Sequence, residues 1–151
     1  MPMTEDLEVQ ARQIIDESLY MVLATADGSG LPWASPVQYA TEDRREFFWV
    51  SRPEATHSQN LLERPELGIV IFDSHIPGEE RQAVYMSAVG RELSPESEGL
   101  EVFSRRSIAN GDPEWTAERV SPPAELRLFG ASVTEHFVLH PDRDERVPVS
   151  L

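Results

Sequence analysis

The sequence predicts a mainly β protein, built as a closed or nearly closed antiparallel barrel with helices at its periphery. Short runs rich in β-branched and aromatic residues outnumber the segments with helical spacing. Turn signals separate many of these runs at the spacing of β-hairpins. A barrel suits such strands because closing the sheet removes the exposed edges that short antiparallel strands otherwise leave.

Six strands are expected, over residues 19–25, 33–40, 47–51, 67–72, 81–93 and 126–140. The first three lie at hairpin spacing, which predicts an antiparallel meander. Gly90 and Gly130 are candidates for a bend or bulge in the two longest strands. The tail after residue 140 is expected to lie on the surface.

Helices are expected at three places outside the strands. The opening helix is amphipathic, and one of its faces carries Leu7, Ala11, Ile14, Ile15 and Ser18. A second helix is predicted over residues 55–63, where Pro65 follows its end. A third begins at Ser94 as N-cap with Pro95 in the first helical position, and a short helix through Trp115 follows it.

Length and charge limit the possible functions. A chain of 151 residues suits one domain, taken here as 1–151, and 13 basic against 27 acidic residues give a formal net charge of −14. So negative a surface repels nucleic acid and anionic membranes. The chain has no cysteine, no apolar run long enough to span a bilayer and no signal-peptide pattern, so we expect a cytoplasmic protein.

A group of hydrogen-bond donors lies between the third strand and the second helix. Within eight residues the chain carries Ser51, Arg52, Thr56, His57 and Ser58. A helix N-terminus offers free amide N–H groups and partial positive charge, so the segment suits an anion such as phosphate. The alternative is that the hydroxyls simply cap the helix.

Other chemistries find little support in the sequence. His136 and His140 lie on one face of a predicted strand but about 13 Å apart by strand rise, which disfavours a shared metal, and we expect no metal site. His136 is expected at the surface or against a partner. There is no Gly-x-Ser-x-Gly, no cysteine nucleophile and no Gly-x-Gly-x-x-Gly after a strand, which argues against a hydrolase and a dinucleotide-binding domain.

The strand–helix junction resembles the flavin mononucleotide (FMN)-binding split β-barrel family, the superfamily of pyridoxamine-phosphate oxidase. In that family a strand ends in Ser or Thr, and about six residues later a basic residue, often Lys, precedes Asn-Leu. Ser51, His57 and Asn60-Leu61 occupy these positions here, with His57 in place of Lys. The resemblance implies a six-stranded Greek-key split barrel that forms a homodimer, with Ser51, Arg52, His57 and Ser58 around the flavin phosphate.

Two further stretches match the family. The second strand contains Ala34, Ser35, Pro36 and Val37, which the resemblance places beside the flavin ring. Glu80-Arg81-Gln82 matches the opening of a strand whose Gln reaches the flavin across the dimer interface, so Gln82 is the corresponding candidate. The tail 141–151 lacks the Trp and Arg pattern of true pyridoxamine-phosphate oxidases, which argues against a vitamin-B6 substrate.

The resemblance therefore predicts an FMN-dependent oxidoreductase acting on a small molecule at a dimer interface, without a nameable general acid or base. Trp33 or Trp115 would help to bury the ring. If His57 binds phosphate only when protonated, flavin affinity should weaken above about pH 7. Three alternatives stay open: a deazaflavin-dependent reductase, a non-catalytic flavin or haem carrier with His75 or His136 as axial ligand, and a dimer with a degenerate, empty site.

Overall fold

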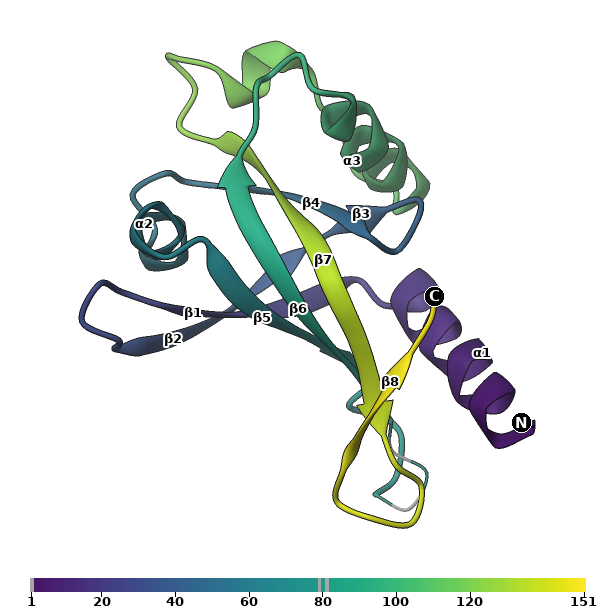
Figure 1. Ribbon diagram of the computed structural model, residues 1–151. Helices are drawn as coiled ribbons and strands as arrows, with labels where there is room; N and C mark the ends of the chain where they lie inside the picture. The colour runs from purple at the N-terminus through teal and green to yellow at the C-terminus, as the bar shows by residue number, and fades with distance from the viewer. Residues whose placement is uncertain (1, 79, 81) are drawn as a thin grey trace.

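The structure is a computed structural model that describes residues 2–78, 80 and 82–151. In chain order the elements are α1 (Pro2–Glu17), β1 (Tyr20–Ala26), β2 (Pro32–Gln38), β3 (Ala40–Thr41), β4 (Glu46–Ser51), α2 (Thr56–Glu63), β5 (Glu66–Phe72), β6 (Ala83–Glu92), α3 (Glu98–Ala109), the 3-10 helix η1 (Ala117–Val120), β7 (Arg127–Leu139) and β8 (Arg146–Val149). All strands belong to one curled antiparallel sheet in the order β2-β1-β5-β6-β7-β4-β3, with β8 added beside β7 (Figure 1).

The sheet curls because one short stretch of chain joins its two ends. β2 stands at one end of the strand order and β3 at the other, and only Tyr39 separates them. Beyond this link β2 pairs, among the described strands, with β1 alone, so its second edge is open and the barrel is split. The hydrophobic core fills the inner face of the curl, with buried side chains that include Met21, Leu23, Phe47, Trp49, Ile69 and Ile71.

Helix α1 closes one end of the curl. Its apolar face is buried in the core through Leu7, Ala11 and Ile15. The helix has no basic residue in its last turn, and other elements satisfy its final carbonyls. The buried Tyr39 hydroxyl donates to the carbonyl of Ile15 at 2.5 Å, and Arg106 of α3 donates to the carbonyl of Asp16 at 3.0 Å.

Helix α3 and the segment after it cover the outer face of β4 and β7 (Figure 1). Leu100 of α3 and Val120 of η1 pack with Leu128 of β7 in a second cluster, which Phe48 and Val50 of β4 flank. The helix lies close: a Cβ added at Gly99 would stand 2.4 Å from the Phe48 ring. The strand half formed by β4 and β7 is therefore shielded on both faces.

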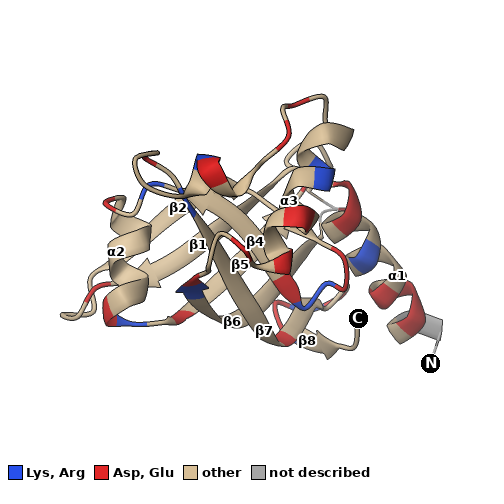
Figure 2. Cartoon of the chain, turned by 90° about the horizontal axis from the view of Figure 1, so that it is seen from above, with Lys and Arg blue, Asp and Glu red and all other residues tan. Residues whose placement is uncertain are grey.

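The outer face of β2, β1, β5 and β6 has no such cover among the described residues. The strand registers bring Ala24 beside Ala34 and Gly68, and Val22 beside Val70. We call these five residues, with Pro36 that continues the row of Val22 and Val70, the bare face. Acidic residues lie mostly on the helices and loops, and the long strands are largely free of charge (Figure 2). An uncharged sheet face of this kind is a typical interaction surface.

Most expectations about the fold are confirmed. The six expected strands form, and α1 buries the face predicted for it. The meander forms only in part, because its second hairpin is reduced to the pairing of β3 with β4 at Ala40 and Thr41, and the rest of β4 pairs with β7. The tail is only partly superficial, since β8 pairs with β7 and Val147, Val149 and Leu151 pack against the core. Among the described helices, none has the length and hydropathy that crossing a bilayer requires.

Several local details differ. The N-cap of α3 is Ser97, whose hydroxyl accepts from Gly99 N, so the helix starts later than the Ser94-Pro95 pair indicated. The helix near Trp115 is η1, which begins only at Ala117. The register between β6 and β7 shifts at Ser87/Ala88, and both glycines proposed as bends sit in regular pairing.

Candidate functional site

The donor group sits where β4 ends and α2 begins. Every second side chain of β4 points into the core, including Phe47 and Trp49, so Ser51 lies on the same inner face. Ala55 is the N-cap residue of α2 and makes no side-chain cap bond. The alternative that hydroxyl groups of this segment cap the helix is therefore wrong for its N-cap position.

Ser51 and His57 contact each other directly. The Ser51 hydroxyl lies 2.9 Å from His57 Nε2, and Ser51 is buried. Burial lowers the pKa of His57 below its ordinary value of 6.5. The imidazole is thus mainly neutral at pH 7, where it can donate through one ring nitrogen and accept through the other.

Arg52 and Ser58 lie beside this pair but are already engaged. The Ser58 hydroxyl is buried and donates to the carbonyl of Arg52 at 2.7 Å, which holds the connection in place. The Arg52 guanidinium is half-exposed and pairs with Glu125 at 2.8 Å and with Glu54 at 3.8 Å. An anion would have to compete with two carboxylates for Arg52.

Helix α2 is tied to the β1–β2 hairpin, which brings β2 to the same end of the barrel. Buried Asn60 donates to the Thr25 hydroxyl at 3.0 Å. Arg64, which follows the helix, donates to the carbonyls of Asp27 and Gly28 at 2.7 and 3.0 Å. The Asn-Leu pair of the family pattern is thus structural here, with the amide of Asn60 and the side chain of Leu61 both buried.

The four candidates on β2 divide between the two faces of the strand. Ala34 and Pro36 are exposed on the bare face, whereas Val37 is buried in the core. Ser35 is half-buried and lies opposite Leu23, on the inner side of the split. Among the described strands β2 pairs with β1 alone, and alternate residues of β2 turn their backbone groups to its other edge, where a ligand could meet them.

Gln82 lies at the other end of the molecule from this junction. It precedes β6, whereas Gly90 near the end of that strand approaches Leu61 of α2. Gln82 and Gly90 are eight positions apart along an extended chain, which corresponds to a distance of about 26 Å at the rise of a strand. Within one chain the structure therefore does not bring Gln82 to Ser51 and His57.

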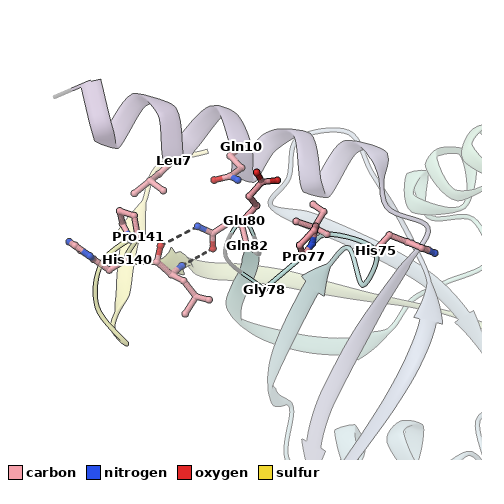
Figure 3. A pocket seen from close by; sticks show the side chains of 11 residues that line it. Leu7, Gln10, His75, Pro77, Gly78, Glu80, Gln82, His140 and Pro141 are labelled. Atoms are coloured by element: carbon pink, nitrogen blue, oxygen red, sulfur yellow. Dashed lines mark hydrogen bonds between the residues drawn. The ribbon is translucent and has the colours of Figure 1, made fainter.

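The Gln82 amide extends the pairing of β6 with β7. Its oxygen accepts from the N–H groups of Ala83 and Leu139, and its nitrogen donates to the carbonyl of Leu139 at 3.1 Å. Among the described residues, the second amide N–H of Gln82 has no hydrogen-bond partner. The residue lines a pocket of about 800 Å³ with Gln10, His75 and His140 (Figure 3). Arg81, from the same sequence run, lies outside the described residues.

His136 differs from the expectation of a surface position. It is buried, and its Nε2 lies 2.6 Å from the carbonyl of Arg44, which makes that nitrogen the donor. Burial lowers the pKa of His136 despite this hydrogen bond. His75, by contrast, is exposed beside Asp73. Over the described part of the chain, no group of three or more His, Asp or Glu side chains is placed to hold a metal ion.

Sequence reasoning missed Arg127, the first residue of β7. It stands directly opposite Ser51 in the ladder between β4 and β7. The alternation of side chains along β7 could have revealed it. Phe129 and Ala131 face the core, so Arg127 belongs to the same inner row. A charged residue in the inward register at a strand end is a candidate for the site.

The profile of the family described as pyridoxamine 5'-phosphate oxidase matches residues 7–138 of the chain. The chain belongs to this family. The match covers strands β1 to β6 and all of β7 but its last residue, and it leaves out β8. It confirms the family resemblance seen at the strand–helix junction. No curated protein sequence matches this family member significantly.

Solved structures of other proteins share the fold of this family member. HutZ, the heme storage protein from Vibrio cholerae, is 20% identical with a TM-score of 0.66, over 85% of this chain and 90% of that one. A heme binding protein from Mycobacterium smegmatis is 18% identical with a TM-score of 0.72, over 94% of this chain and 57% of that one. An F420 reductase is 13% identical with a TM-score of 0.63, over 83% and 94%. At these identities the likeness concerns the fold.

Proposed function

We propose that the protein is a homodimeric FMN-binding oxidoreductase that acts on a small molecule. The observation that carries the proposal is the Ser51–His57 pair at the junction of β4 and α2, on the inner row that Arg127 shares. These donors would hold the flavin phosphate, with Arg52 and Ser58 alongside. A hydrogen bond between a charged and a neutral group contributes about 1.5–3 kcal/mol net.

The ring would lie along the open edge of β2, at Ala34, Ser35, Pro36 and Val37. Backbone N–H and C=O groups on an unpaired edge can meet the polar rim of a flat heterocycle, and small side chains let it approach. Trp33, half-exposed on the same strand, is available to shield it from water. When bound, FMN supplies the redox chemistry, and the chain positions it and limits access.

The homodimer is proposed from the bare face. A sheet face with exposed Ala24 and Ala34 and half-buried Val22 and Val70 is suited to a second copy, because these side chains are small or apolar and none is charged. The partner would also bring its Gln82 end toward the open edge of β2. The remaining N–H of Gln82 is the group it could offer to the flavin.

Haem binding is the second candidate, because two structural relatives carry that description. His75 is the available axial ligand, since it is exposed at the pocket of about 800 Å³, whereas Nε2 of His136 is occupied by Arg44. A deazaflavin-dependent reductase is the third, by likeness to the F420 reductase.

A titration of the purified protein with FMN, hemin and the deazaflavin cofactor tests the proposal, with binding read from the absorption spectrum of each. We expect saturation by FMN at one per chain and reduction of the bound flavin by a nicotinamide cofactor. Saturation by hemin with no response to FMN, lost in His75→Ala, would establish the haem alternative. Binding of the deazaflavin alone would establish the third.

A further inference from the structure

Arg127 lies in the same row of side chains as Ser51. The two residues are direct partners in the β4–β7 ladder, and directly opposite Cβ atoms in such a pair lie about 4.5–5.5 Å apart. The neighbours in β7 fix the direction of the row, since Leu128 packs on the outer side against α3 and Phe129 on the inner side in the core. Arg127 therefore belongs to the inner row of the sheet, directly across from Ser51 at the end of β4.

The guanidinium of Arg127 is held with one edge open. Its Nη1 donates to the carbonyls of Ala124 and Leu126, both at 2.6 Å. These two bonds use both N–H groups of Nη1. The N–H groups on Nε and Nη2 have no partner within the described residues, and together they form the side-on fork that binds a carboxylate or phosphate through two bonds.

Arg127 is also half-buried, and no carboxylate of the described residues pairs with it, in a chain of net charge −14. The nearby Arg52 is neutralised by Glu54 and Glu125. His57, where the family pattern has a basic residue, is half-buried and hydrogen-bonded to Ser51. Of the cationic groups placed near Ser51, Arg127 is the one whose charge is not already compensated within the described part of the chain.

We propose that Arg127 is the charged anchor of a phosphate monoester at this site. The Ser51–His57 pair donates one neutral hydrogen bond to it, because the bond between the two side chains uses the other hydrogen. The inference rests on the proposed function and deepens it, because it moves the positive charge of the site from α2 to β7. The fork of Arg127 selects a terminal phosphate over an uncharged hydroxyl at the same place. FMN should therefore bind far better than riboflavin, which differs only by that phosphate.

The experiment compares the dissociation constants of FMN and riboflavin for the wild-type protein, Arg127→Gln, Arg127→Lys and a control, Arg143→Gln. The control makes the same change in net charge on an exposed arginine of the β7–β8 turn. Arg127→Gln should weaken FMN binding by about tenfold or more and leave riboflavin binding nearly unchanged. Arg127→Lys keeps the charge without the fork and should give an intermediate loss of FMN affinity. It replaces Arg127→Gln in the comparison if that variant does not fold.

Other outcomes decide between the two proposals. If FMN binds and both Arg127 variants keep the wild-type preference for FMN over riboflavin, the role of Arg127 is refuted and the proposed function stands. If wild-type protein binds neither flavin, the proposed function fails. Inorganic phosphate then replaces FMN as the probe, and the thermal unfolding midpoint is measured with and without it. A rise in the midpoint of wild type and Arg143→Gln, but not of Arg127→Lys, would support an anion site at Arg127. No rise in the midpoint of wild type would refute it.

Discussion

The Ser51 hydroxyl lies 2.9 Å from Nε2 of His57, so the last residue of β4 and the second residue of α2 hold each other across the connection between them. This contact gives the imidazole a hydrogen-bond partner that does not require it to be charged. Because burial lowers the pKa of His57, the free protein holds a neutral donor where the family pattern holds a cation.

His57→Lys should therefore strengthen FMN binding near neutral pH. Lysine adds the positive charge that His57 lacks there, and a charged hydrogen bond is worth about 1.5–3 kcal/mol against 0.5–1.5 for a neutral one. We expect an affinity gain of about fivefold or more at pH 7.5, measured by fluorescence titration. A variant with unchanged or weaker FMN binding and an intact fold would place the phosphate elsewhere.

The pH dependence of FMN binding also tests the protonation state of His57. The pKa of His57 in the free protein lies below 6.5, so protonation that favours phosphate sets in only below that value. Wild-type affinity should be flat above neutral pH, and relative to His57→Gln it should rise as pH falls below about 6. A steep loss between pH 7 and 8 that His57→Gln abolishes would show that the imidazole carries charge at neutrality.

Tyr39→Phe should destabilise the fold by about 1–2 kcal/mol, since it leaves the buried carbonyl of Ile15 without its donor. Burial also raises the pKa of Tyr39, so the hydroxyl remains protonated as a donor throughout the range in which proteins are handled. Urea unfolding measures the loss, and Tyr20→Phe, which changes an exposed hydroxyl, is the control. Equal midpoints for the two variants would mean that the contact does not anchor α1.

The stability of the fold should fall as the pH drops below about 6.5. His57 and His136 both have pKa values lowered by burial, so the unfolded chain binds more protons than the folded chain in this range. Their stabilising contribution is present above pH 6.5 and is lost as pH falls through the folded pKa values. Unfolding free energies from pH 7.5 to 5 should decline less for His57→Gln/His136→Gln than for wild type. The same decline in both proteins would assign it to other groups.

Ala24→Asp should convert the proposed dimer to a folded monomer. Ala24 is exposed at the centre of the bare face, so the substitution adds a charge that one chain tolerates in water and two chains cannot bury together. Sedimentation velocity distinguishes the two states. Ile108→Asp places the same charge on exposed α3 and should leave the dimer intact. An Ala24→Asp protein that sediments like wild type would move the interface to another surface.

Strand periodicity predicted the strands and the opening helix well, because the alternating burial of Phe47 and Trp49 and the apolar face of Leu7, Ala11 and Ile15 are local patterns. Pairing partners were harder. That β4 pairs with β7 depends on contacts between residues 76 to 86 positions apart in the sequence, and hairpin spacing says nothing about such pairs.

The candidate site was predicted less completely for the same reason. Ser51 and His57 are six residues apart and their contact follows from one strand–helix junction. Arg127 reaches the site only through the register of β4 with β7, and Glu125 neutralises Arg52 through the same long-range pairing. Gln82 looked like a free ligand group in the sequence, whereas its amide completes the β6–β7 ladder at Leu139.

The most direct test of the account is sedimentation velocity of the FMN-loaded protein, recorded at the flavin absorption band. We expect all protein-bound flavin to travel with a species of two chains, and Ala24→Asp to sediment as a single chain without flavin. Flavin that travels with the Ala24→Asp monomer, or a wild-type dimer that leaves the flavin behind, would contradict a site formed where two copies meet.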